Sequence, residues 1–226
     1  MKKNKVIGII SIIALLSILI VSGTSAYLTS TDTATNEFTI GSVKIKLLEP
    51  TWKGEGVVDT DGDGTPDFAE NIVPNATIPK DPQIKNTGEN DAYVYLKVTI
   101  PAKKVITAAK DGTVLNDGVA VDTPLFTYNV NTDWKEITSA MDTTTNDSDE
   151  ITEYIHVYYY NKAIKKDETT TALFNTVTFA NVIDEQIESP GSYNIKIDAY
   201  AIQSNNINVE SIEEAYAIYV NQNKNN

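Results

Sequence analysis

The chain has 226 residues, a formal net charge of −13 at pH 7 and no cysteine. Its 18 basic residues are all lysines, so the bidentate phosphate and guanine contacts that arginine makes are excluded. An acidic surface also repels a phosphate backbone, and we expect no nucleic-acid partner. The absence of cysteine excludes disulfides and lipid attachment through an N-terminal cysteine, so packing, hydrogen bonds or a metal must stabilise the fold.

The first residues have the pattern of a secretory signal peptide. Three lysines precede an apolar run, Val6–Val21, which small residues follow. Thr24 and Ala26 fit the −3 and −1 positions of a signal-peptidase site, which predicts cleavage of residues 1–26 and a mature chain that starts at Tyr27. The alternative is an uncleaved membrane anchor, but the run is shorter than the roughly 17–25 residues that span a bilayer. Both interpretations place the rest of the chain outside the cytoplasm, and cleavage would leave no stable membrane span.

Alternation of apolar and polar residues with a period of two predicts half-buried strands. The alternation is most regular in Ala92–Ile100 and Tyr193–Ala201. In Phe38–Leu48 the apolar residues change parity around Gly41, which predicts a bulge there. Further strands are predicted at Leu125–Val130, Tyr154–Tyr160 and Thr176–Phe179, with turns at 86–91 and 116–118.

Two polar stretches interrupt this pattern, and a helix follows it. Residues 52–82 are rich in Asp, Gly and Pro and are predicted to be an insertion, whereas Met141–Glu150 is predicted to be a solvated loop. Ser211 and Glu214 form a capping-box pattern, which predicts a short helix over Ile212–Val220. The fold class we predict is all-β, an antiparallel jelly-roll-like sandwich over residues 38–220, with a disordered tail at 221–226.

The most specific local motif is DTDGDGTPDFAE, Asp59–Glu70, which matches a twelve-residue calcium-binding loop. Carboxylates occupy positions 1, 3, 5, 9 and 12, Gly64 provides the turn at position 6, and position 7 contributes its carbonyl. The predicted Ca²⁺ ligands are Asp59, Asp61, Asp63, Thr65, Asp67 and Glu70. Pro66 and the preceding KGEGVV segment do not fit a helix-loop-helix hand, and the loop resembles the isolated calcium loops of thrombospondin type 3 repeats. The alternative is an acidic, glycine-rich surface loop without metal. If calcium binds, we expect a structural role.

Segments near both ends of the chain match a family pattern in order. The signal ends in GTSAYL, a strand with Phe38, Gly41 and Val43 follows, and PKDPQIKNTGENDAYVYLKV comes later. Together they resemble the TasA/camelysin family of exported Gram-positive matrix proteins, and the match is weak over roughly residues 103–188. The resemblance implies processing by a SipW-type signal peptidase at Ala26/Tyr27 and a jelly-roll sandwich. It also implies a secreted or cell-surface location and assembly into biofilm fibres, in which the N-terminal strand of one subunit completes the sheet of the next. Tyr27–Glu37 would be that strand, although its polarity is equally consistent with a flexible leader.

Two other functions stay open. Some camelysin-type proteins are labelled metalloproteases, but His156 is the single histidine and no HExxH pair exists, so we expect no enzyme. His156 is expected to lie on a sheet face. The second alternative is an adhesin or carbohydrate-binding module with an exposed aromatic platform, formed by Tyr93, Tyr95, Tyr154, Tyr158 and Tyr160.

Overall fold

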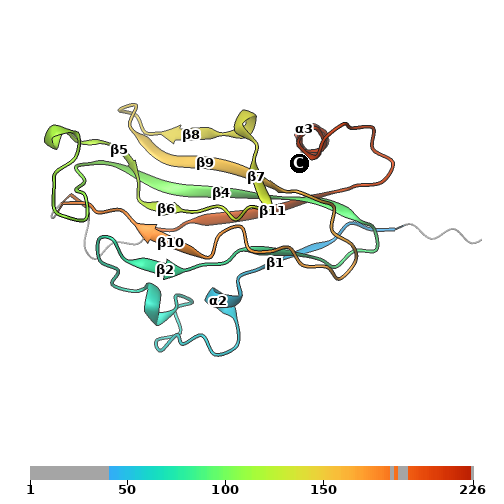
Figure 1. The fold of residues 1–226 in the computed structure, drawn as a ribbon, viewed down its shortest axis with the longest axis horizontal. Coiled ribbons are helices and arrows are strands. Elements are labelled where there is room, and N and C mark those ends of the chain that lie inside the picture. The colour runs from blue at the N-terminus through green and yellow to red at the C-terminus, as the bar shows by residue number, and fades with distance from the viewer. Residues whose placement is uncertain (1–40, 184–185, 188–192, 225–226) are drawn as a thin grey trace, which may run out of the picture. The chain divides into compact units, whose positions relative to one another are not determined.

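Two antiparallel β layers face each other across an apolar core (Figure 1). The computed structural model describes residues 41–183, 186–187 and 193–224. The predicted signal peptide, its cleavage site, the Tyr27–Glu37 leader and residues 38–40 of the first predicted strand lie outside the described residues. The bulge prediction at Gly41 rests in part on Phe38 and Ile40, which lie outside the described residues too.

One layer is a sheet of order β11-β4-β9-β7. The long strand β4 also pairs with β5, and β9 also pairs with β8. The bounds are β4 (Ala92–Val105), β5 (Val121–Pro124), β7 (Trp134–Glu136), β8 (Asp142–Thr145), β9 (Ile151–Tyr160) and β11 (Lys196–Gln203).

The other layer joins two smaller sheets, β1-β3 and β2-β10-β6. Backbone hydrogen bonds between β3 and residues 168–170, such as Thr170 N to Ile84 O at 2.9 Å, make the layer continuous. The bounds are β1 (Ile45–Leu48), β2 (Thr77–Pro79), β3 (Gln83–Asn86), β6 (Phe126–Tyr128) and β10 (Thr176–Phe179). The α-helices are α2 (Pro50–Lys53) and α3 (Ile212–Asn223), and 3₁₀ turns cover Asp67–Ala69, Asn116–Gly118 and Thr138–Ala140.

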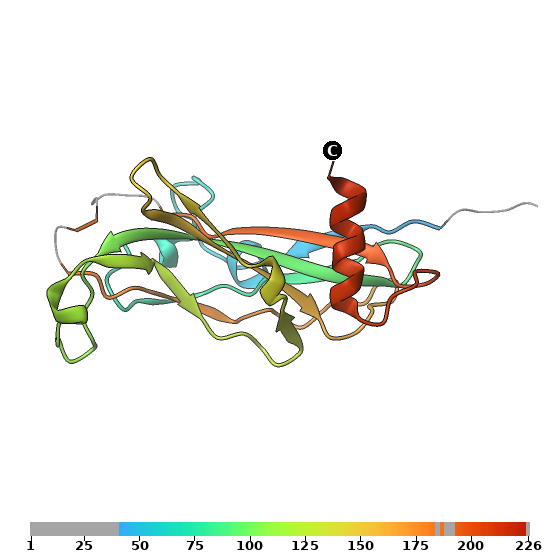
Figure 2. The same cartoon turned by 90° about the horizontal axis from the view of Figure 1, so that it is seen from above.

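The period-two pattern of β4 places alternate side chains on the two faces of its sheet. Val94, Leu96 and Val98 are fully buried between the layers. On the opposite face, Tyr95 packs under α3, where its hydroxyl donates to Ile212 O at 2.8 Å. The α3 helix lies across this outer face (Figure 2). The all-β fold class predicted from the sequence is therefore correct.

Several predicted boundaries need correction. The β4 strand continues past Ile100 to Val105, and the helix extends to Asn223, so the tail predicted to be disordered is helical at its start. Met141–Asp149 are exposed as expected, but Asp142–Thr145 within them form β8. The predicted insertion also ends earlier than residue 82, because β2 and the buried residues 80–82 belong to the sandwich.

The cap of α3 follows the prediction in part. Ser211 Oγ accepts a hydrogen bond from Glu214 N at 3.1 Å, as expected for an N-cap. The carboxylate of Glu214 accepts from the backbone of Glu210 at 2.8 Å, one residue earlier than in a capping box. None of the described helices is long and apolar enough to cross a membrane.

The five tyrosines do not form one exposed platform. Tyr158 and Tyr160 are 4% and 5% exposed and face the core between the layers, whereas Tyr93 and Tyr95 lie beneath α3. The reason is strand register: Tyr158 lies opposite Leu96, and Tyr95 lies opposite Tyr159. Residues opposite each other share a face, so Tyr158 faces the same side as Leu96.

Candidate functional site: an acidic loop beside an open edge

The acidic loop winds around its own carboxylates. Asp59 accepts hydrogen bonds from the backbone N–H groups of Gly62 and Gly64, at 2.7 and 3.0 Å. Both glycines have positive φ, 73° and 91°, which a side chain would disfavour. Asp61 accepts from Asp63 N at 3.2 Å, and Asp63 accepts from Thr65 N at 2.7 Å. The turn predicted at Gly64 is present, and local hydrogen bonds hold the loop.

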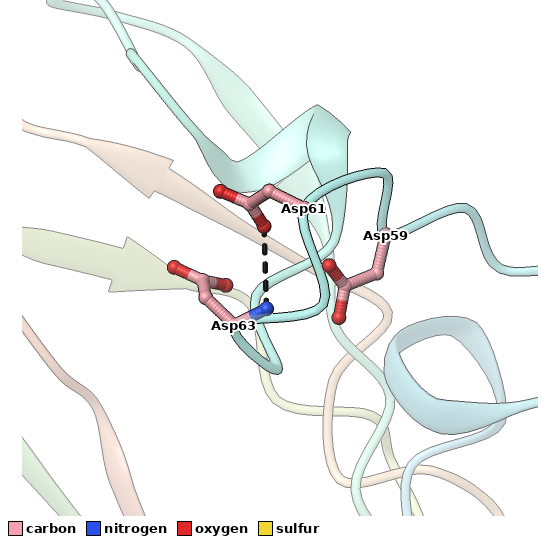
Figure 3. Close-up of side chains that lie close together, drawn as sticks. All are labelled: Asp59, Asp61 and Asp63. Atoms are coloured by element: carbon pink, nitrogen blue, oxygen red, sulfur yellow. Dashed lines mark hydrogen bonds between the residues drawn. The ribbon is translucent and has the colours of Figure 1, made fainter.

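Three of the predicted ligands come together. Carboxylate oxygens of Asp59, Asp61 and Asp63 all lie within 4.8 Å of one another (Figure 3). Calcium binds oxygens at about 2.3–2.6 Å, so three oxygens at this separation fit around one ion. This is the one group of three or more potential metal ligands among the described residues.

The other three predicted ligands are arranged differently. Both carboxylate oxygens of Asp67 accept hydrogen bonds from Thr60, from its N–H at 2.7 Å and its hydroxyl at 2.6 Å, and these bonds lower the pKa of Asp67. Glu70 stands outside the three-aspartate group. Desolvation raises its pKa, and repulsion from Asp61 and the other loop aspartates raises it further. Thr65 is half-buried, and its N–H bonds to Asp63.

Contacts that are distant in sequence attach this insertion to the sandwich. Asp81, which is 8% exposed, accepts hydrogen bonds from the N–H and the hydroxyl of Thr51 at 2.9 and 2.6 Å. The side chain of Lys80 is 7% exposed, and its ammonium lies 2.7 Å from Glu49 and 4.5 Å from the ring centroid of Trp52. Sequence reasoning missed these anchors, because nothing in the polar PKDP segment identifies partners about 30 positions earlier.

A cavity of about 620 Å³ lies between the insertion and the edges of the two layers. Asp61, Asp63 and Glu70 line it on the insertion side. Its apolar lining includes Ile78, Phe126, Val177, Phe179 and Ile195. The cavity therefore joins an acidic rim to side chains of the sandwich core.

Two of the strands beside this cavity, β2 and β11, are edge strands. Lys80 N bonds to Asn175 O, so the backbone groups of Thr77 and Pro79 point away from β10. Ser204 N bonds to Asp91 O, which makes the even-numbered residues of β11 the ones that bond to β4. The backbone N–H and C=O groups of the odd-numbered residues of β11 therefore point away from β4. Within the described part of the chain, β1, β2 and β11 each have a strand partner on one side alone.

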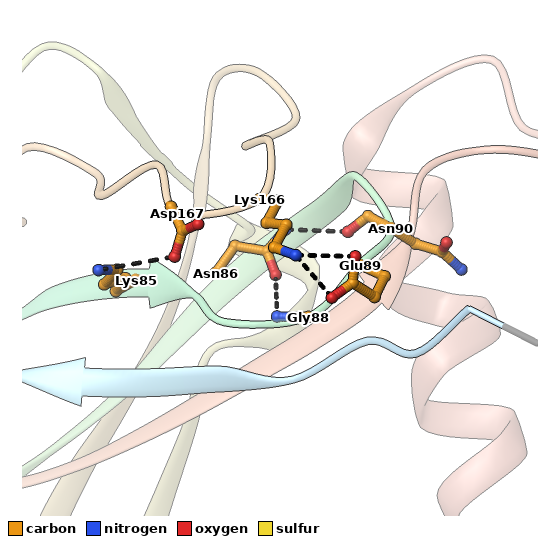
Figure 4. Close-up of polar contacts among 7 residues, drawn as sticks. All are labelled: Lys85, Asn86, Gly88, Glu89, Asn90, Lys166 and Asp167. Carbon is orange, nitrogen blue, oxygen red and sulfur yellow. Dashed lines mark hydrogen bonds and ion pairs between the residues drawn. The ribbon is translucent and has the colours of Figure 1, made fainter.

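The chain enters the sandwich through a close backbone crossing. Ser42 O and Lys44 O accept hydrogen bonds from the turn after β3, including Gly88 N to Lys44 O at 3.0 Å. A Cβ atom on Gly88 would overlap the backbone of Ser42 and Lys44, so glycine is required there. The buried Asn86 fixes the turn by accepting from Gly88 N at 2.9 Å and donating to Asn90 O at 2.9 Å (Figure 4).

His156 lies on the sheet, as expected, and contacts Glu136 rather than a group of metal ligands. Its Nδ1 is 2.5 Å from Glu136 Oε1. The neighbouring Tyr158 hydroxyl is 3.1 Å from the hydroxyl of Tyr128, and burial raises the pKa of Tyr158 to about 12.

Comparison of the chain with family models, curated proteins and solved structures gives no significant match.

Proposed function

We propose that this chain is a secreted structural protein of a bacterial extracellular matrix, which assembles by strand addition between copies and is stabilised by calcium. The observation that carries the proposal is the open side of the sandwich. There, β2 and β11 offer free edges beside a cavity of about 620 Å³, whose lining combines core side chains with carboxylates of the acidic loop. The proposal assigns the chain no enzymatic activity.

Strand addition uses groups that an edge strand already presents. An extended segment can pair with outward-facing backbone groups while its alternate side chains enter an apolar cleft. On β2, Thr77 offers both a donor and an acceptor, whereas Pro79 offers its carbonyl alone. On β11, the residues whose backbone groups point away from β4 are Ile197, Ala199 and Ala201. Their side chains pack against the core. An incoming strand therefore has more bonding positions along β11 than along β2.

The expected donor segment and the cavity have the same sign of charge. Tyr27–Glu37 contains Asp32 and Glu37 and no basic residue, and the cavity rim carries Asp61, Asp63 and Glu70. Like charges that are brought together in a partly desolvated cleft repel. A divalent cation held by the loop aspartates reduces this repulsion, so we propose that calcium favours assembly as well as loop order.

The adhesin alternative loses its main support, because the tyrosines proposed as a binding platform lie on different faces and three of them are buried. A proteolytic site would need several metal ligands near His156, and the described residues that surround it supply Glu136 alone within bonding distance.

Electron microscopy and sedimentation of the chain that starts at Tyr27 test the proposal. We expect fibres or large oligomers in millimolar calcium, fewer of them after chelation, and none when residues 27–37 are deleted. A synthetic Tyr27–Glu37 peptide, added in excess, should compete with assembly, whereas a scrambled peptide should not. A chain that stays monomeric with its leader and calcium present would refute the proposal.

A further inference from the structure

The outer face of the large sheet carries a group of tyrosines that the proposed strand addition does not use. Tyr200 lies opposite Tyr95, and Tyr95 lies opposite Tyr159, so a row of tyrosines crosses β11, β4 and β9. Residues opposite each other share a face of the sheet. The α3 helix crosses this face (Figure 2) and adds Tyr216 and Tyr219, which are three positions apart and therefore lie on one side of the helix.

The rings of Tyr200 and Tyr219 form a direct contact between β11 and α3. Their centroids are 5.2 Å apart, and their planes are inclined by 32°. Burial raises the pKa of Tyr219, and the nearby Tyr200 hydroxyl raises it further. Because a charge effect of this kind falls with distance, the hydroxyl ends of the two rings lie near each other, and not their Cβ ends alone.

The other tyrosine pairs of this face are less accessible or lie within one element. Tyr95 and Tyr216 have ring centroids 5.0 Å apart, but Tyr95 is fully buried and its hydroxyl donates to Ile212 O. Tyr216 and Tyr219 are 6.2 Å apart on the same helix, so a bond between them would not connect α3 to the sheet. Tyr200 and Tyr219 are both half-buried, so each keeps a part of its side chain in contact with solvent.

We infer that Tyr200 and Tyr219 are a site of oxidative cross-linking, at which a bond between the two rings fastens α3 to β11. An external one-electron oxidant, such as a peroxidase with hydrogen peroxide, removes one electron from each phenol, and each phenol loses its proton to water. The two phenoxyl radicals join through the ring carbons next to their hydroxyls, and the hydrogens on those carbons move to the oxygens as the phenols re-form. The pair loses two hydrogen atoms in total, which reduce one hydrogen peroxide to two water molecules.

Such a bond gives the chain a covalent link that its composition otherwise excludes. There is no cysteine, so no disulfide joins its elements. A bond between residues 200 and 219 closes the loop that leads from β11 into α3, and it restricts the unfolded chain in the same way as a disulfide. Neither the leader nor calcium takes part, so this inference is independent of the proposed function.

The test oxidises the chain that starts at Tyr27 with a peroxidase and hydrogen peroxide, at a protein concentration low enough to keep copies apart. A protease that cuts after glutamate separates the two tyrosines, because Glu210, Glu213 and Glu214 lie between them. We expect dityrosine fluorescence and one predominant linked pair of peptides, lighter by two hydrogen atoms in mass spectrometry. In urea, where the folded geometry is lost, this pair should no longer predominate.

Two conservative variants identify the ring that takes part. Tyr219→Phe removes one hydroxyl and keeps the ring, and it should abolish the linked peptides. Tyr216→Phe is the matched control on the same helix and should keep them. Circular dichroism checks that both variants fold. The oxidised chain should also unfold at a higher temperature than oxidised Tyr219→Phe, because it alone carries the link.

Several results would overturn the inference: links between separate copies alone, equal linking in the folded and the urea-unfolded chain, linking that survives in Tyr219→Phe, or equal unfolding temperatures. The proposed function is judged separately, since Tyr219→Phe should assemble in calcium like the unmodified chain. Assembly of a chain that forms no such link would leave strand addition standing and the inference wrong. A linked chain that stays monomeric would do the reverse.

Discussion

The sandwich core and the acidic insertion are held in opposite ways. The core consists of apolar side chains from segments that are far apart in sequence, such as Leu96, Leu173 and Phe174, all fully buried. The insertion around Asp59–Glu70 is held by short-range hydrogen bonds from carboxylates to nearby N–H groups. Apolar burial does not depend on dissolved ions, whereas a group of neighbouring carboxylates does. Bound cations should therefore act on the insertion and leave the packing of the core unchanged.

The largest expected effect comes from the core. Leu96→Ala removes a fully buried side chain and should lower the free energy of unfolding by about 3 kcal/mol. Urea unfolding followed by circular dichroism measures this. The matched change in the insertion, Val58→Ala, alters a side chain that is 61% exposed and should shift stability by less than about 0.5 kcal/mol. Equal losses would contradict the distinction between the two regions.

High pH should also act on the core. The pKa of Tyr158 is about 12 in the folded chain, chiefly through burial, and about 10 in the unfolded chain. A raised folded pKa means that stability is complete below pH 10 and falls as the pH rises towards 12. This group should account for a loss of about 2–3 kcal/mol. Unfolding measured at several pH values should show a smaller loss in Tyr158→Phe, and an unchanged dependence would show that another group is responsible.

Calcium should act through the insertion alone. When free calcium exceeds its dissociation constant about thirtyfold, binding to the folded state adds about 2 kcal/mol. Asp61→Asn should remove this gain, because it replaces one of the three grouped carboxylates. Asp111→Asn is the control, since Asp111 also accepts a backbone hydrogen bond, from Thr113, in a different loop. Equal calcium responses in both variants, or no heat of binding by calorimetry, would refute the calcium site.

The smallest effect concerns the helix that covers the outer sheet face. Ser211→Ala removes the side-chain acceptor of Glu214 N and should cost about 1 kcal/mol. Ser211→Asn keeps an N-cap acceptor and should stay near the unmodified value. Thermal unfolding measures both. Because α3 packs on the core rather than on the insertion, calcium should not change the difference between the variants.

The parts of the fold that the sequence predicted are those whose local pattern agrees with their tertiary surroundings. Thr176–Phe179 is a strand over the predicted residues, and the strand that starts at Ala92 buries its predicted apolar face, although Tyr95 and Thr99 on the other face are buried as well. The β8 strand was missed because Asp142–Thr145 are all exposed and carry no apolar alternation. Its pairing with β9 decides its conformation, and that pairing is not visible in the local sequence.

The candidate site was predictable in its motif and not in its surroundings. The spacing of Asp59, Asp61 and Asp63 predicted a group that the structure contains. Asp67 lies outside this group because its carboxylate accepts hydrogen bonds from both the N–H and the hydroxyl of Thr60. The cavity depends on where the chain returns after long intervals, as at Ile78 and Val177, and no local pattern specifies that.

The backbone crossing at Gly88 has a mechanical consequence. If copies join through their leaders, tension along a fibre enters each subunit at Gly41 and is directed along the segment that leads into β1. The hydrogen bonds at Ser42 and Lys44, and those of β1 to β3, lie across that direction, so they are loaded together in shear rather than opened one after another. The subunit should therefore resist pulling from this end more strongly than its short first strand suggests.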